Sequence, residues 1–150
     1  MQTLGSADGL KSIETRIGAL TATDQRRWGT MSVDGMICHL SDSYKLALGE
    51  RTVSMAAEFR HRRLIKWIAL WTPLKWPKGT PTRPEVQQGV GGTAPVDFEQ
   101  DRRHLLALVN RFSSGLDVSI PHPFFGRLTR SEWLRWGYLH ADHHLRQFGR

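Results

Sequence analysis

Residues 131–148 read Ser-Glu-Trp-Leu-Arg-Trp-Gly-Tyr-Leu-His-Ala-Asp-His-His-Leu-Arg-Gln-Phe, and this is the most informative stretch of the chain. Its large apolar side chains recur every three or four residues, which is the period of a helix with one buried face. Thr129 followed three residues later by Glu132 is typical of a capping box, so we predict a helix from about Arg130 to Phe148. At 100° per residue, one face of this helix gathers seven residues within about 120°: Trp133, Trp136, Gly137, His140, His144, Gln147 and Phe148.

Two histidines of this predicted buried stripe, His140 and His144, are four residues apart. That spacing separates them by about 40° of rotation and one helical turn, so both imidazoles can reach one metal ion. His143 lies off the centre of the stripe, at its rim, while Asp142 and Arg146 fall on the opposite face, which we expect to be solvated. Pairs at this spacing also occur by chance in many helices, so a metal site requires a third donor.

The third donor must come from one of four other histidines. His61 stands among arginines, whose charge opposes a cation, and His122 lies between two prolines, where we expect a structural hydrogen bond. His104 follows two arginines, whereas His39 has the most apolar neighbours and sits at the edge of its helix's apolar stripe. The geometry of the sequence permits His39 as the third ligand without requiring it.

The same helical periodicity recurs upstream, with glycine and proline breaks between the segments. Strand-like alternation is nearly absent, and residues 72–96, rich in proline and glycine, read as one long connection. We therefore predict an all-α protein, a four-helix bundle with a long crossover connection, forming one domain over residues 1–150. The further helices are expected at Leu10–Leu20, at about Met31–Leu48, from Met55 to about Trp71, and from Val96 or Asp97 to Phe112.

The composition argues against a disordered chain and against a specific nucleic-acid-binding protein. Hydrophobic residues make up 39% of the chain, with six Trp and six Phe, which excludes disorder over most of its length. The 21 Lys and Arg exceed the 14 Asp and Glu by seven, but they are scattered and accompany no nucleic-acid motif, so we expect no specific nucleic-acid binding. The N-terminus has no apolar core of signal-peptide length, which favours a cytoplasmic protein.

Two further features concern single residues and short runs. The longest apolar-rich run, Leu64–Trp76, is shorter than the roughly 20 residues of a membrane span. Its tryptophans, Trp67, Trp71 and Trp76, could line a pocket or a dimer face, and we favour buried core for each. The single cysteine, Cys38, excludes an internal disulfide and is expected to be a small core residue rather than a nucleophile.

The motifs of the chain resemble those of the DinB/YfiT-like superfamily. The resemblance rests on His-Leu-x-Asp at residues 39–42 and His-x-x-x-His-x-x-Gln at residues 140–147. It is closer to an uncharacterised branch with His-Pro-x-Phe-Gly, then Glu-Trp, then His-x-x-His-His-x-x-Gln-Phe, found here at residues 122–126, 132–133 and 140–148. The order of elements matches over the whole chain, and the matches are dense only in the last 30 residues.

This resemblance implies a bundle that is often dimeric and that holds a divalent metal ion on His39, His140 and His144. Members with assigned activities include transferases and isomerases that use bacillithiol, mycothiol or glutathione. Three-histidine sites suit Zn, Ni, Fe or Cu, of which we favour Zn or Ni. Asp42 and His143 are the candidates for orienting these ligands, although for Asp42 we favour a solvated helix position.

We therefore expect a metal-dependent enzyme, a thiol-dependent S-transferase or a hydrolase, in which metal-bound water or a substrate thiolate reacts. A low-molecular-weight thiol would be its second small molecule, and a homodimer its assembly. The alternative is a non-catalytic bundle that binds a metal or a small ligand. A third reading, a peripheral membrane or nucleic-acid binder, would use the arginines and the Leu64–Trp76 run.

Overall fold

The computed structural model describes residues 1–57, 60–116 and 118–150, and these residues form an all-helical protein. They contain no strand, and their one pairing of extended chain is a bridge between His122 and Gly126. The predicted all-α class is therefore confirmed. The helices are α1 (Ala7–Gly18), α2 (Val33–Ala47), α3 (Arg62–Trp71), the 3₁₀ helix η1 (Pro84–Val86), α4 (Phe98–Ser114) and α5 (Arg130–Gln147).

Side-chain caps fix where four of these helices begin. Ser6, Ser32 and Asp97 each accept a hydrogen bond from a backbone N–H of the first turn, and Thr129 does so within a complete capping box with Glu132. The Ser6 cap starts α1 three residues before the predicted Leu10. The predicted ends of α2, α4 and α5 differ from the observed ones by only one or two residues.

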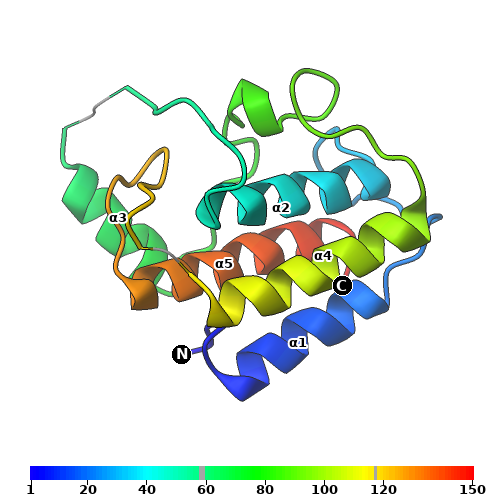
Figure 1. Cartoon of the computed structure of the whole chain (residues 1–150), viewed down its shortest axis with the longest axis horizontal. Helices are drawn as coiled ribbons and strands as arrows, with labels where there is room; N and C mark the ends of the chain where they lie inside the picture. The colour runs from blue at the N-terminus through cyan, green and yellow to red at the C-terminus, as the bar shows by residue number, and fades with distance from the viewer. Residues whose placement is uncertain (58–59, 117) are drawn as a thin grey trace.

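Four helices, α1, α2, α4 and α5, make the bundle (Figure 1). The colour gradient shows α2 and α4 running in one direction, with α1 and α5 running in the other. Because α2 and α4 are packed neighbours with the same direction, the chain must cross the whole bundle between them. That crossover carries α3, which packs on α5, and η1, which packs on α2.

The predicted start of the third helix at Met55 is wrong. Residues 58–59 lie outside the described part of the chain, and α3 begins at Arg62, after His61 in a left-handed conformation with φ of 65°. At Ala56 the chain is not helical, because the Ala56 N–H donates to the carbonyl of Pro123 at 3.0 Å. The three tryptophans of this region are also not all core: Trp67 is 56% exposed, and Trp71 and Trp76 are half-buried against the core.

One close helix contact depends on a glycine. A Cβ atom on Gly137 of α5 would lie 2.6 Å from Cε1 of Phe112 of α4, so α4 and α5 can approach only because the side chain is missing. The Tyr44 hydroxyl of α2 donates to the Gly137 carbonyl at 3.0 Å, which ties a third helix to the same point. The missing side chain of Gly137 therefore lets two neighbouring helices approach α5 at one point.

The buried stripe of α5 differs in part from the predicted one. Trp133, Trp136 and Gln147 are buried as expected, but Asp142 and Arg146 are half-buried rather than solvated, because Asp142 pairs with Arg16 of α1 at 2.9 Å. Arg135 is buried as well, since its guanidinium donates to main-chain carbonyls of Leu70 and Gln2. Within the described residues, no helix has the length and apolar character needed to cross a bilayer.

Candidate metal centre

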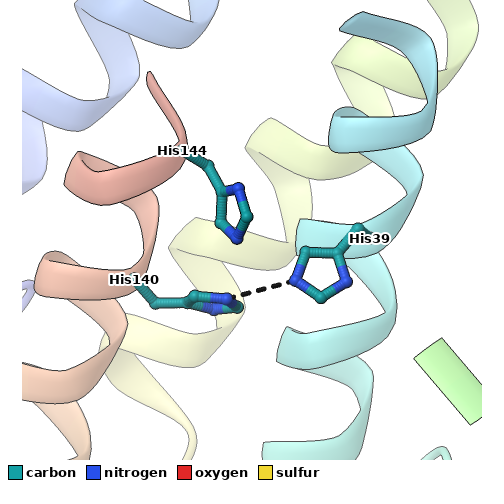
Figure 2. Close-up of side chains that lie close together, drawn as sticks. All are labelled: His39, His140 and His144. Carbon is teal, nitrogen blue, oxygen red and sulfur yellow. Dashed lines mark hydrogen bonds between the residues drawn. The ribbon is translucent and has the colours of Figure 1, made fainter. Parts of the chain in front are cut away.

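Three histidines converge between α2 and α5, as Figure 2 shows. His39 projects from α2, and His140 and His144 project from successive turns of α5, so that the three rings face one another. One ring nitrogen from each lies within 4.8 Å of the others, and the ring centroids are 4.8–5.2 Å apart. The structure therefore brings together all three residues that the sequence analysis named as metal ligands.

A main-chain carbonyl sets the orientation of His39. Its Nδ1–H donates to the carbonyl of Val86, the last residue of η1, at 2.8 Å. Because the proton is then on Nδ1, the lone pair of Nε2 points toward the other two histidines, 3.2 Å from Nε2 of His140. This is how protein metal ligands are usually held, with the outer ring nitrogen bound to a carbonyl or carboxylate.

His144 is oriented by a chain of two hydrogen bonds. The amide nitrogen of Gln147 donates to the Trp28 carbonyl at 2.8 Å, which leaves the Gln147 amide oxygen facing Nδ1 of His144 at 3.1 Å. An amide oxygen only accepts, so Nδ1 of His144 carries the proton and Nε2 is free to bind a metal. Gln147 thus orients the histidine of the preceding turn.

His140 is held by packing rather than by a hydrogen bond on its outer nitrogen. Its ring stacks on Trp136 with centroids 4.9 Å apart, and Nδ1 is buried without a partner in the described part of the chain. Burial lowers the pKa of His140 well below the ordinary value of 6.5, and positive charge on His144 or His39 would lower it further. Burial also lowers the pKa of His39 and of His144.

These features together fit a divalent metal ion. All three imidazoles are neutral at pH 7, which is the form that binds metal. In a tetrahedral site with metal–nitrogen distances near 2.1 Å, ligand nitrogens lie about 3.4 Å apart, close to the 3.2 Å between His39 and His140. The ligand nitrogen of His144 lies within 4.8 Å of the other two.

Asp42 does not lie on a solvated face, and that preference of the sequence analysis was wrong. Its side chain is fully buried and forms an ion pair with Arg51 at 2.8 Å. It also accepts from the backbone N–H and the hydroxyl of Thr93, at 2.8 and 2.7 Å. Arg51 donates in turn to the carbonyl of Glu85, the residue before Val86. Asp42 therefore supports His39 indirectly, through the crossover segment that supplies the Val86 carbonyl.

The other four histidines lie outside the cluster. His143 is half-buried beside His144, with ring centroids 5.2 Å apart, but contributes no atom to the cluster. His104 and His61 are exposed. His122 is buried, and its Nδ1 accepts from the backbone N–H groups of Phe124 and Phe125, which is the structural role expected of it.

Cys38 is a core residue, as expected. It is buried and its thiol lies 3.8 Å from a carboxylate oxygen of Asp101. Burial raises the pKa of this thiol to about 12, so it is protonated at neutral pH and a poor nucleophile. The candidate chemistry of the site therefore does not include this cysteine.

A cavity of about 460 Å³ opens beside the three histidines, a size typical of small-molecule sites. The crossover between α2 and α4, including residues of α3 and η1, supplies much of its wall. His39, His140, His143 and His144 all line the cavity. Its apolar wall includes Trp28, Met31, Val53, Trp76, Phe125 and Trp136.

Sequence reasoning missed the residues that the crossover brings to the site. Val86 contributes a main-chain carbonyl, which has no side-chain signature, and Arg51 and Thr93 lie outside the helix of Asp42, 9 and 51 residues away in sequence. A buried aspartate in an otherwise apolar helix is a signal that a distant cation must accompany it. Trp28 and Trp76 could be placed on the cavity only from the fold.

An all-helical bundle with three convergent histidines beside a cavity defines a class of proteins with a candidate mononuclear metal site. Within that class, the chain belongs to the DUF1569 family, described as "protein of unknown function (DUF1569)", whose model matches residues 4–150. No curated protein matches the chain, and no solved structure does. The wider DinB/YfiT-like relationship remains a prediction from the motifs.

Proposed function

We propose that this protein is a metal-dependent enzyme of the DinB/YfiT-like superfamily that binds one divalent ion through Nε2 of His39, His140 and His144. The observation that carries the proposal is the convergence of three neutral imidazoles beside a cavity. Structural zinc sites are usually closed by four protein ligands, whereas catalytic sites keep a position open for substrate. Zn and Ni are the favoured ions, and Fe and Cu also suit three histidines.

The reaction type that fits this site is thiol-dependent S-transfer or hydrolysis. A bound divalent ion supplies Lewis-acid chemistry, which lowers the pKa of a coordinated water or thiol. The chain's own contribution is to hold the three histidines, through Val86 and Gln147 for two of them, and to line the site with aromatic side chains. His143 and His122 also line the cavity without belonging to the proposed ligand set.

Metal analysis of protein purified without a histidine tag tests the first step. We expect about one ion per chain, lost in His144→Ala and retained in His143→Ala, because only the first residue belongs to the cluster. The two variants are matched, since the residues are adjacent on α5. Less than about 0.2 ion per chain, unchanged by His144→Ala, would contradict the proposal.

Turnover assays with a panel of low-molecular-weight thiols and esters test the second step. Turnover that needs the ion and fails in His144→Ala supports the enzyme. A full complement of metal with no turnover, together with tight retention of a small molecule, would favour the alternative, a non-catalytic bundle that binds a metal or small ligand.

We also propose that two copies of the chain associate through α3. Large apolar side chains are exposed on this helix and just after it, at Leu64, Ile65, Trp67 and Leu74. Exposed apolar patches on a helix commonly mark interaction surfaces. The resemblance to a superfamily whose members are often dimeric favours a second copy as the occupant.

A further inference from the structure

His122 has a donor group that the fold itself does not use. Its side chain is only 5% exposed, and its ring packs against Phe125 and Trp136, with centroids 4.8 and 5.0 Å away. It also lines the cavity beside the three histidines. A buried polar group on a cavity wall costs free energy unless it finds a hydrogen-bond partner there.

The position of the His122 proton follows from its neighbours. Nδ1 accepts from the backbone N–H groups of Phe124 and Phe125, at 3.1 and 3.2 Å, so it carries no proton. Burial keeps the ring neutral, and the single proton must then be on Nε2, at the opposite edge of the ring. Within the described parts of the chain, no residue accepts this Nε2–H. The turn therefore fixes an Nε2–H donor on a residue that lines the cavity.

The cavity is short of negative charge. Among the described residues that line it there is no aspartate or glutamate, and Arg83 is the one lining residue with a permanent charge. Arg83 lies close to Glu85, which partly offsets it. Three neutral ligands leave the charge of a divalent ion uncompensated in an apolar enclosure, and such a charge is stabilised by an anion.

We propose that His122 is a ligand-recognition residue: its Nε2–H donates to an acceptor oxygen of a small apolar molecule whose anionic group faces the three-histidine site. The anionic part of this inference rests on the proposed function. His122 and His140 both contact the Trp136 ring, 5.0 and 4.9 Å from its centroid, and both line the same cavity, so the proposed ligand lies in that cavity. The ligand class is an apolar carboxylate or thiolate with a second acceptor group.

Binding of simple aromatic acids to the zinc-loaded protein tests this proposal. The probes are benzoylpropionate, benzoylbutyrate and benzoylvalerate. Each is compared with the phenylalkanoate that lacks the ketone, and each acid is compared with the primary alcohol in which a hydroxymethyl group replaces the carboxylate. Trp28, Trp76 and Trp136 line the cavity, so tryptophan fluorescence reports binding, and calorimetry gives the affinity. We expect at least one ketone to bind about tenfold tighter than its ketone-free partner, and the acid to bind about tenfold tighter than the alcohol.

Matched histidine variants identify the donor. His122→Asn keeps an acceptor near the position of Nδ1 but removes Nε2–H, so the ketone advantage should vanish while phenylalkanoate affinity is kept. His104→Asn makes the same change at an exposed histidine and should keep the advantage. An advantage that survives His122→Asn, or no ketone preference in any pair, would overturn the assignment. In the unsubstituted protein, an NMR signal of the His122 Nε2–H that shifts equally with both members of a pair would also overturn it.

The metal-free protein separates this inference from the proposed function. Among the primary alcohols, the tighter binding of the ketone over its ketone-free partner depends only on His122, so it should persist without the ion. The tighter binding of each acid over its alcohol depends on the ion, so it should disappear. If metal analysis finds no ion, the proposed function fails but the ketone preference still tests His122. If the ion is present and acids bind no better than alcohols, the anionic class is wrong while the metal site stands.

Discussion

At the scale of single residues, the site depends on how each imidazole is held rather than on the presence of histidine alone. His39 and His144 have their outer nitrogens fixed by acceptors, and His140 has only a stacked indole. Fixing the proton on Nδ1 makes Nε2 a ready ligand and raises its basicity. Removing the hydrogen bonds on these outer nitrogens should therefore lower the affinity for metal.

Replacing Gln147 tests this directly. Gln147→Leu removes the acceptor for Nδ1–H of His144, and we expect metal affinity to fall about 10- to 100-fold, measured by competition with a chromophoric chelator. Gln147→Glu is the matched variant, because a carboxylate still accepts that proton although it can no longer donate to the Trp28 carbonyl, and it should lose less affinity than Gln147→Leu. Equal losses in both variants would show that the orientation of His144 has another cause.

His122 makes a prediction for stability in acid. Burial lowers its pKa to about 3 in the folded protein, against 6.5 ordinarily, so between these values the unfolded chain binds more protons. The contribution of neutral His122 is fully present above pH 6.5 and is lost as the pH falls toward 3. From pH 7 to pH 5 this amounts to about 2 kcal/mol.

Urea unfolding of metal-free protein at several pH values measures this effect. His122→Asn has no group that titrates in this range at that position, so its unfolding free energy should fall by about 2 kcal/mol less than that of the unsubstituted chain. His104→Asn, at an exposed position, should follow the unsubstituted chain. Parallel curves for all three proteins would contradict the assigned protonation of His122.

At the scale of helices, two contacts set how the site-bearing elements approach each other. The first is Gly137, where a methyl group would lie 2.6 Å from Phe112. We expect Gly137→Ala to lower the free energy of unfolding by about 1–3 kcal/mol, although alanine is the better helix former by about 1 kcal/mol. Gly18→Ala is the control, because nothing lies within 4 Å of its Cβ, and it should be neutral or stabilising. Urea unfolding that shows both variants equally stable would mean that α4 and α5 can separate freely.

The second contact is the buried ion pair of Asp42 and Arg51, which ties α2 to the crossover. Asp42→Ala leaves Arg51 without its buried partner and should lower the free energy of unfolding by about 3 kcal/mol. It should also weaken metal binding, because the segment that presents the Val86 carbonyl to His39 is loosened. Glu50→Ala, which removes an exposed ion pair with Arg111, is expected to cost less than about 1 kcal/mol. Unchanged metal affinity in a folded Asp42→Ala protein would remove Asp42 from the support of the site.

At the scale of the whole molecule, the proposed dimer can be tested at the exposed apolar side chains of α3. We expect analytical ultracentrifugation to show a dimer that Trp67→Glu converts to a monomer, with the metal content unchanged because Trp67 is 56% exposed and does not line the cavity. Val96→Glu places the same charge at an 89% exposed position outside α3 and should leave the dimer intact. A monomeric unsubstituted protein would rule this surface out as a dimer contact.

The sequence by itself determined the helical class, the caps at Thr129 and the two-histidine spacing on the last helix, because these follow from periodicity and local chemistry within one turn. It did not determine the start of α3, where a contact between Ala56 and Pro123 overrides local preference, or the burial of Asp42. Only the tertiary structure brought His39 to the pair on α5, placed the Val86 carbonyl behind it and turned His122 toward the cavity. The physical reason is that spacing along a helix fixes which residues share a face. What that face meets is decided by how the crossover and the neighbouring helices pack against it.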